Sequence, residues 1–326
     1  MQMGWGYALP LIIETAVHER VFDVLDSGPK TVDQVSKETG TPERGLRMIM
    51  NALAGVNLLS KDDQQRYSLT EESSAFLVSS KPSFFGGLFK HISSQLLPKW
   101  IQLPEIVHNG RPATAVNSQD EGAEFFAQFV ADIFPMSYPS ATTLAKHLNL
   151  ASAAETLRVL DIAAGSGVWG IALAQASPRV RVTAVDWPRV LEVTKQMTQR
   201  FGLADRYEYV AGDIGEVDFG SGYNIATLGH ILHSEGAPRS RKLLRKLFDA
   251  LAPGGTIAIA EFLVNNDRSG PPQGLIFAVN MLVNTDDGDT YSFEEIAAWL
   301  KEAGFANART LESPGPSPLI LANKPK

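Results

Sequence analysis

The chain has 326 residues, with 29 Lys and Arg against 36 Asp and Glu, and it contains no cysteine. This length predicts two domains, each large enough to bury its own core. Without cysteine the protein has no disulfides, no thiolate metal ligands and no cysteine nucleophile. The net charge of −7 gives no indication of binding to nucleic acid or to an anionic membrane. The most apolar early run, 8–13, is too short to span a bilayer, so we expect a soluble cytoplasmic protein.

The pattern over residues 1–90 predicts a mainly helical domain of the winged-helix type. In chain order we expect a helix over 8–27, a helix that starts after Thr31 and ends before Gly40, a helix over 42–54, a hairpin of strands 56–59 and 67–69, and a helix that opens at Thr70. Winged helices bind DNA or serve as structural or dimerising modules. The second helix of the pair offers only Arg44, Arg47 and Asn51 to a phosphate backbone, which favours the second role.

The stretch 84–150 is predicted to be helical throughout and contains an aromatic-rich run over 124–138. An aromatic stripe at helical spacing usually belongs to a core. Because this run lies just before the second domain, it can also form a pocket wall. We therefore take Phe126, Val130, Phe134 and Met136 as candidate substrate contacts.

From residue 158 the pattern becomes strand alternating with helix. The predicted strands are 158–162, 181–185, 208–211, 224–228 and 256–263, and the predicted helices lie near 167–176, 188–201, 238–251 and 293–303. Two successive strands, 306–311 and 318–322, close the chain and predict an antiparallel hairpin. The alternation predicts an α/β fold with a Rossmann-like, mostly parallel sheet that binds its ligands at the carboxyl ends of the strands.

The segment DIAAGSGVWG, residues 161–170, joins the first of these strands to the next helix. Its glycines match GxGxxG, which by itself is compatible with NAD. The strand ends in Asp161, however, and a carboxylate there repels a pyrophosphate but accommodates a sulfonium or ammonium group. Asp161, Gly165 and Gly167 are therefore candidate contacts of a cationic nucleoside cofactor.

Two further strands also end in acids. Asp186 closes the second strand and is placed to accept both ribose hydroxyls, with Trp187 beside it to stack on or cover an adenine ring. Asp213 closes the third strand and can accept from the adenine amino group, with Ile214 as an apolar neighbour. Acids at three strand ends favour S-adenosylmethionine over NAD.

Together these features resemble the S-adenosylmethionine-dependent O-methyltransferases of the plant caffeate and bacterial natural-product type. The resemblance covers nearly the whole chain, from residues 6–7 through the glycine loop to the final hairpin. It implies a winged-helix dimerisation domain over 1–90, a helical connector with pocket helices over 91–150 and a class I methyltransferase domain over 151–326. It also implies a homodimer that methylates a hydroxyl of a small aromatic or polyketide-like acceptor.

The resemblance assigns the chemistry to two residues, one after the fourth predicted strand and one near the end of the fifth. His233 matches the family's catalytic histidine, and Glu261 matches the carboxylate that orients it. A neutral imidazole can take the proton of a phenol, whose oxygen then attacks the sulfonium methyl group in line. The neighbouring His230 is placed among the cofactor contacts. A metal site built on the two histidines lacks a third ligand at a defined spacing, so we expect no metal.

The chain departs from the family pattern at three positions near the histidine. Ser234 stands where an acid usually follows the histidine, Thr290 replaces a second flanking carboxylate, and Gly229 replaces a lysine that contacts the cofactor. These departures leave open catalysis by proximity alone, methylation at carbon, and chemistry with S-adenosylmethionine other than methyl transfer. An NAD-dependent oxidoreductase and a winged-helix regulator are the alternatives from other classes.

Further candidate substrate contacts lie between the fifth strand and the last helix. They are Phe277, Asn280, Met281 and Asn284. By the resemblance, Met281 packs on the acceptor ring, and its soft side chain suits a flat apolar ligand. The spacing of Phe277 and Met281 fits a core position equally well.

Overall fold

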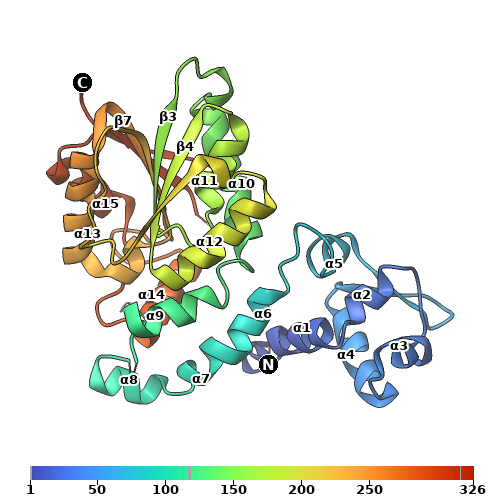
Figure 1. The fold of residues 1–326 in the computed structure, drawn as a ribbon. Helices are drawn as coiled ribbons and strands as arrows, with labels where there is room; N and C mark the ends of the chain where they lie inside the picture. Colours follow the sequence, from blue (N-terminus) through green and yellow to red (C-terminus); the bar gives the residue numbers. More distant parts are fainter. Residues whose placement is uncertain (1, 113, 117–118, 316) are drawn as a thin grey trace. The chain divides into compact units, whose positions relative to one another are not determined.

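The structure is a computed structural model, and it describes residues 2–112, 114–116, 119–315 and 317–326. The chain divides into two compact units, Met1–Pro98 and Lys99–Lys326 (Figure 1). The segment expected as a connector, 91–150, is therefore shared between them, with its larger part in the second unit.

The first unit is a small helical domain with a two-stranded hairpin. Its elements are the 3-10 helix η1 (Gln2–Trp5), α1 (Ala8–His18), α2 (Val21–Leu25), α3 (Val32–Thr39), α4 (Glu43–Gly55), β1 (Leu59–Lys61), β2 (Tyr67–Leu69), α5 (Glu71–Phe76), α6 (Gly87–His91) and the π-helix η2 (Ile92–Leu96). This order confirms the predicted winged helix. Both predicted helix starts, at Thr31 and Thr70, are confirmed, and in the structure each threonine forms a capping box, at the start of α3 and of α5.

The helix predicted over 8–27 is wrong as a single element. Arg20 has a left-handed φ of 59°, so α1 ends at His18 and α2 begins at Val21. Residues of both helices, among them Ala16 and Phe22, are buried in one core. The apolar spacing that predicted one helix therefore reflects burial on both sides of a turn.

The second unit is an α/β domain. Helices α7 (Leu97–Trp100), which crosses the boundary between the units, α8 (Leu103–Asn109), α9 (Gln119–Ala127), α10 (Phe134–His147) and η3 (Leu150–Ser152) precede its sheet. The strands are β3 (Leu157–Ile162), β4 (Val180–Asp186), β5 (Tyr207–Ala211), β6 (Tyr223–Gly229), β7 (Leu251–Ala260), β8 (Ala306–Leu311) and β9 (Leu319–Asn323). The helices between them are α11 (Val168–Ala176), α12 (Pro188–Arg200), η4 (Ala204–Arg206), α13 (Leu232–Ala250), α14 (Pro272–Asn284) and α15 (Phe293–Ala303).

The strands form one sheet in the order β5-β4-β3-β6-β7-β9-β8. The strands β3 to β7 pair in parallel, whereas β9 runs antiparallel to both β7 and β8. This confirms the predicted mostly parallel sheet with a closing hairpin. The order reverses at β3, which has β4 on one side and β6 on the other, and such a switch point is where open α/β sheets bind ligands.

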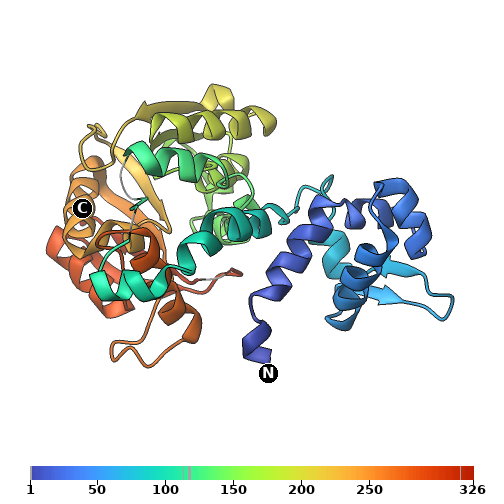
Figure 2. The same cartoon turned by 90° about the horizontal axis from the view of Figure 1, so that it is seen from below.

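Helices cover both faces of the sheet (Figures 1 and 2). Val159 faces a core shared with α10 and α11, and the next residue, Leu160, faces a core shared with α13 and α15. This alternation buries both faces, as a parallel sheet requires. None of the helices in the described ranges is long and apolar enough to cross a membrane.

Several predicted boundaries in this unit move. The fifth strand of the parallel series ends at Ala260 and not at 263, while Leu263 makes only an isolated bridge to Tyr291. Helix α13 begins at Leu232, before the predicted 238, and bends at Gly236, whose φ is 72°. Helix α14 was not predicted, and the stretch 84–150 is several helices separated by turns.

Candidate active site

The glycine loop between β3 and α11 is tied to the neighbouring strand and helix. The Gly165 N–H donates to the Asp186 carboxylate at 2.9 Å, and the Thr194 hydroxyl donates to the Gly165 carbonyl at 2.7 Å. Gly165 and Gly167 have φ values of +56° and +74°, which favour glycine. A Cβ at Gly167 would lie 2.9 Å from the Thr194 Cγ2 atom, so the loop leaves no room for a side chain there.

Asp161 lies at the end of β3 and is fully buried. Its Oδ1 accepts the Thr227 hydroxyl at 2.8 Å, and its Oδ2 accepts the Gly170 N–H at 3.0 Å. Burial raises the pKa of this carboxyl to about 7. Both oxygens are thus used to hold β3, β6 and the first turn of α11 together. The structure places Asp161 under the loop as a support, and its direct contact with a cofactor stays a prediction.

Asp186 lies at the end of β4, beside the glycine loop. Its carboxylate accepts the Gly165 N–H and, at 2.7 Å, the Trp187 N–H. Burial raises its pKa to about 6. The Trp187 ring lies 6.1 Å from the Phe126 ring, between centroids, so α9 and the start of α12 meet at this edge.

Asp213 follows β5 and is paired with an arginine that the sequence did not single out. Its Oδ1 accepts the Gly215 N–H at 2.7 Å and Arg239 Nη2 at 3.2 Å. Arg239 also donates to Glu235 at 2.7 Å. Burial raises the pKa of Glu235 against the opposing effect of Arg239. The next residue, Ile214, is buried in the core on the α13 side of the sheet.

His233 and Glu261 form the hydrogen-bonded pair that the resemblance implied. His233 Nδ1 lies 2.6 Å from Glu261 Oε1, and the His233 backbone N–H donates to Glu261 Oε2 at 3.1 Å. Burial acts to raise the pKa of Glu261, but the adjoining His233 outweighs it and holds that pKa below its usual value. An ionised carboxylate only accepts, so Nδ1 carries the proton and Nε2 carries the free lone pair. This is the tautomer that a general base requires.

Aromatic rings surround this histidine. The Phe277 ring meets the His233 ring edge-on at 4.9 Å, and the Phe262 ring lies 4.3 Å from Phe277, between centroids. His230 lies 4.9 Å from the Phe262 ring, and its Nε2 pairs with the Ser317 hydroxyl at 2.9 Å. Burial lowers the pKa of His230 to about 4, so this ring is neutral. The structure engages His230 with Ser317, and its cofactor contact stays a prediction.

Helix α14 carries a short hydrogen-bonded amide chain. Asn280 Oδ1 accepts from Trp100 Nε1 at 3.0 Å and from Asn284 Nδ2 at 3.1 Å. The Asn284 Oδ1 and Thr290 Oγ1 atoms are buried without a hydrogen-bond partner among the described residues. Met281, on the same helix, is 5% exposed.

The four candidates before the sheet divide into two groups. Phe126 contacts Trp187, and Val130 lies against the glycine loop, where a Cβ built on Gly165 would meet it at 3.6 Å. Phe134 instead stacks on Phe201 and Tyr138 in the core, and Met136 contributes its carbonyl near Gly315. The structure thus brings two of the four to the carboxyl edge of the sheet.

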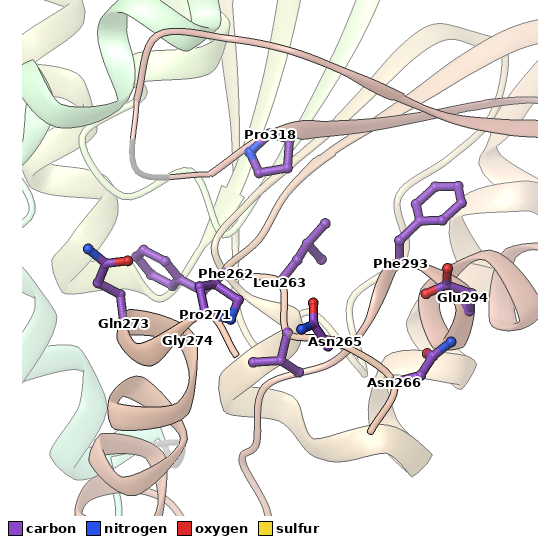
Figure 3. A pocket seen from close by; sticks show the side chains of 11 residues that line it. Phe262, Leu263, Asn265, Asn266, Pro271, Gln273, Gly274, Phe293, Glu294 and Pro318 are labelled. Atoms are coloured by element: carbon purple, nitrogen blue, oxygen red, sulfur yellow. The ribbon is translucent and has the colours of Figure 1, made fainter. Parts of the chain in front are cut away.

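A cavity of about 460 Å³ lies beside Phe262 (Figure 3). Phe262 and Gln273 form one side of it, Phe293 and Glu294 the other, and Pro318 lies above. Asn265 and Asn266 add amide groups. Of its 11 lining residues none is cationic, and Glu294 is the one acid.

Two family models match the chain. The O-methyltransferase dimerisation domain matches residues 1–79, and the O-methyltransferase domain matches residues 107–306. The chain belongs to the O-methyltransferase family. It is an S-adenosylmethionine-dependent methyltransferase, which decides against the NAD-dependent oxidoreductase among the alternatives.

The sequences of several relatives match this O-methyltransferase over nearly its whole length. The 3-hydroxy-5-methyl-1-naphthoate 3-O-methyltransferase of Streptomyces sahachiroi is 29% identical over 318 residues, which is 96% of this chain and 91% of that protein. A crystal structure of a Nostoc punctiforme protein assigned to the O-methyltransferases has a TM-score of 0.88 at 31% identity, covering 99% and 98% of the two chains. The structure of PigF with S-adenosylhomocysteine has a TM-score of 0.84 at 25% identity and covers 99% of this chain and 98% of that chain. PigF of a Serratia species is also among the sequence relatives, at 29% identity over 99% of this chain and 94% of that protein.

The residues at the carboxyl edge of the sheet fit this cofactor. Carboxylates lie at the ends of β3 and β4 and just after β5, and Arg239, the cation bonded to one of them, is itself paired with Glu235. Such an edge suits a ligand with sulfonium and ammonium charges and disfavours a pyrophosphate. Among the described residues, no group of three or more His, Asp or Glu side chains could hold a metal ion.

Several residues that build this site escaped the sequence analysis. Thr227 and Thr194 hold Asp161 and the glycine loop, Arg239 pairs with Asp213, and Ser317 pairs with His230. Thr227 could have been suspected, because it is a polar residue inside an otherwise apolar strand. The other three come from separate elements, and no local pattern marks them.

Proposed function

We propose that this O-methyltransferase transfers the methyl group of S-adenosylmethionine to a hydroxyl of a small aromatic or polyketide-like acceptor, with His233 as general base. The pairing of His233 Nδ1 with the buried Glu261 carboxylate carries the proposal, because it leaves Nε2 free to accept a proton. The printed activities of two relatives support the acceptor class, a hydroxynaphthoate 3-O-methyltransferase and a tetracenomycin polyketide 8-O-methyltransferase.

The geometry supports the following roles. S-adenosylmethionine supplies an electrophilic methyl group on a sulfonium. His233 takes the proton of the acceptor hydroxyl at Nε2, and the oxygen becomes the nucleophile. Glu261 holds the ring through Nδ1 and stabilises the imidazolium that forms. Nothing in this step needs Ser234, whose hydroxyl donates to the carbonyl of Ile231.

The cofactor-binding roles are proposed on the same basis. Asp186 accepts the ribose hydroxyls, Asp213 with Ile214 meets the adenine, and Trp187 covers the ring. Gly165 and Gly167 let the backbone approach the nucleoside closely. Asp161, which is 0% exposed and bonded to Thr227 and Gly170, acts by holding the glycine loop in place.

The acceptor is proposed to lie along α14, against Phe277, Asn280, Met281 and Asn284. The ring of Phe277 touches the His233 ring, so an acceptor next to Phe277 is within reach of the base. The cavity beside Phe262 offers room for a further ring. Its lack of a cationic side chain suits a neutral group there.

We also propose a homodimer formed through the first unit. The match to a dimerisation domain supports it, as do Trp5 and Tyr7, which are stacked on each other and are 64% and 57% exposed. Exposed aromatic side chains are typical of association surfaces. Analytical ultracentrifugation should give twice the 35.4 kDa chain mass, and a monomer at micromolar concentration would contradict the proposal.

The function is tested with S-adenosylmethionine and a panel of hydroxylated naphthalenes, anthraquinones and polyketide-like phenols. The methylated atom is assigned by NMR of the product, so methylation at carbon would be seen directly. For the most active acceptor, His233→Gln should lower kcat by about 10²–10⁴-fold. The matched control is His147→Gln at an exposed position of α10, which should stay within twofold of the parent. A loss of less than about tenfold for the His233 variant would refute the general-base role.

A further inference from the structure

Trp169 lies in the first turn of α11 and reaches across to the end of β6. A Cβ built on Gly229 would lie 1.9 Å from Trp169 Nε1 and 2.6 Å from its Cδ1. The nitrogen edge of the indole therefore occupies the space that any side chain at position 229 would need. Ile162 pairs with Leu228, so Gly229 lies beside the start of the glycine loop. The indole N–H is thus held at the switch point of the sheet, where β3 and β6 end.

This N–H has no hydrogen-bond partner among the residues that the structure describes, although Trp169 is only 5% exposed. A buried tryptophan N–H usually finds a partner. The partly buried indole of Trp100 does so by donating to Asn280. The Trp169 N–H is therefore a donor that is fixed in place and free to meet a ligand.

The chemistry of the surrounding edge indicates which ligand group it meets. Asp161 and Asp186 accept hydrogen bonds from the protein, and Glu261 is occupied by His233. These carboxylates suit the positive charges of the cofactor but repel its one carboxylate. If Asp186 takes the ribose and Asp213 the adenine, the amino-acid end lies toward β3 and β6. A carboxylate there needs a donor.

We propose that the Trp169 indole N–H donates a hydrogen bond to the carboxylate of the amino-acid end of S-adenosylmethionine, and that Gly229 is required because it leaves space for the indole. Trp169 is thus a cofactor-binding residue. The inference rests on the orientation of the cofactor given under the proposed function, and it adds a contact and a reason for the glycine.

The test compares two ligands by calorimetry. S-adenosylhomocysteine carries the amino-acid end, whereas 5′-methylthioadenosine has the same nucleoside and sulfur without it. Trp169→Phe keeps an aromatic ring but removes the N–H. Because hydrogen bonds to charged groups are the stronger class, we expect its Kd for S-adenosylhomocysteine to rise about 10- to 100-fold. The Kd for 5′-methylthioadenosine should change less than about twofold.

Two further variants complete the design. Gly229→Ala keeps the tryptophan but displaces its indole, and it should weaken S-adenosylhomocysteine and spare 5′-methylthioadenosine in the same way. Trp299→Phe removes a buried indole that packs on Tyr291, away from the loop, and should leave both affinities unchanged. Retained binding of 5′-methylthioadenosine shows that each variant is folded.

The outcomes separate this inference from the proposed function. Equal losses for both ligands in Trp169→Phe, or no loss for either, would overturn the inference, because the indole would then act only by packing. If the parent protein binds neither ligand, the cofactor assignment fails instead. Loss of catalysis in His233→Gln with normal binding of both ligands leaves the role of Trp169 intact.

Discussion

Replacement of Glu261 by glutamine tests the centre of the proposed mechanism. Glu261 is 0% exposed and accepts three hydrogen bonds, from the His233 backbone N–H at 3.1 Å, from His233 Nδ1 at 2.6 Å and from the Phe262 N–H at 3.1 Å. Oε1 receives the last two of these. Glutamine has nearly the same shape but is neutral, and only one of its two terminal atoms accepts.

The geometry sets the size of the effect. The glutamine oxygen can take the place of Oε1 and keep the bonds to Nδ1 and Phe262, while the amide nitrogen then faces the His233 backbone N–H. That buried donor loses its partner, which lowers the free energy of unfolding by about 1–3 kcal/mol. The imidazolium formed during the reaction also loses its counter-ion. Exchanging a charged for a neutral hydrogen bond costs about 1–2 kcal/mol, or about 5- to 30-fold in kcat.

The assay measures kcat with saturating cofactor and acceptor. We expect Glu261→Gln to lower kcat by the amount above, because the imidazolium formed in the reaction is no longer stabilised by an adjacent negative charge. Glu302→Gln serves as control, because Glu302 is on the surface and pairs with Arg241.

One result would refute the reasoning. If Glu261→Gln binds S-adenosylhomocysteine like the parent and keeps its kcat, then the carboxylate does not serve the histidine. A lower kcat together with weaker binding of S-adenosylhomocysteine would mean that Glu261 only holds the local structure.

Three further predictions concern the scaffold of the site and are tested by urea unfolding. Burial raises the pKa of Asp161 to about 7, so between about pH 4 and pH 7 the folded state holds a proton that the unfolded state has lost, and the free energy of unfolding falls as pH rises. Asparagine does not titrate, so between pH 5 and 7 the free energy of unfolding of Asp161→Asn should rise by about 2–3 kcal/mol relative to that of the parent. Parallel plots of unfolding free energy against pH for the two proteins would contradict this. Gly167→Ala should cost about 1–3 kcal/mol, because φ is +74° and the new Cβ lies 2.9 Å from its nearest neighbour, whereas Gly202→Ala, with φ +67° and open space, should cost only about 1 kcal/mol. Thr290→Val removes a buried hydroxyl that has no partner among the described residues, and it should leave the free energy of unfolding unchanged or raise it. Thr227→Val removes the hydroxyl that donates to Asp161 and should lower the free energy of unfolding by at least about 1 kcal/mol. A larger loss of stability for Thr290→Val than for Thr227→Val would show that the Thr290 hydroxyl has a partner.

The strand and helix pattern of the second unit could be predicted because its elements are long and their signals are local. The glycine loop, the acid that ends β3 and the caps at Thr31 and Thr70 are each contained within a few residues. The break at Arg20 was missed for the same reason, since apolar spacing continues across it. Helix α14 was not predicted, although Phe277 and Met281 are four residues apart, as on one face of a helix.

The amino-acid sequence by itself determined the class of fold and the cofactor, and by resemblance it predicted the pair of His233 and Glu261. Only the tertiary structure decided how these residues are used. It joined His233 to a carboxylate 28 residues away, buried Asp161 between Gly170 and a threonine 66 residues away, and set the indole of Trp169 against Gly229. Parallel strands bring together residues from distant segments, and the direction of a side chain there depends on the packing of its neighbours. Local sequence patterns carry no record of that packing.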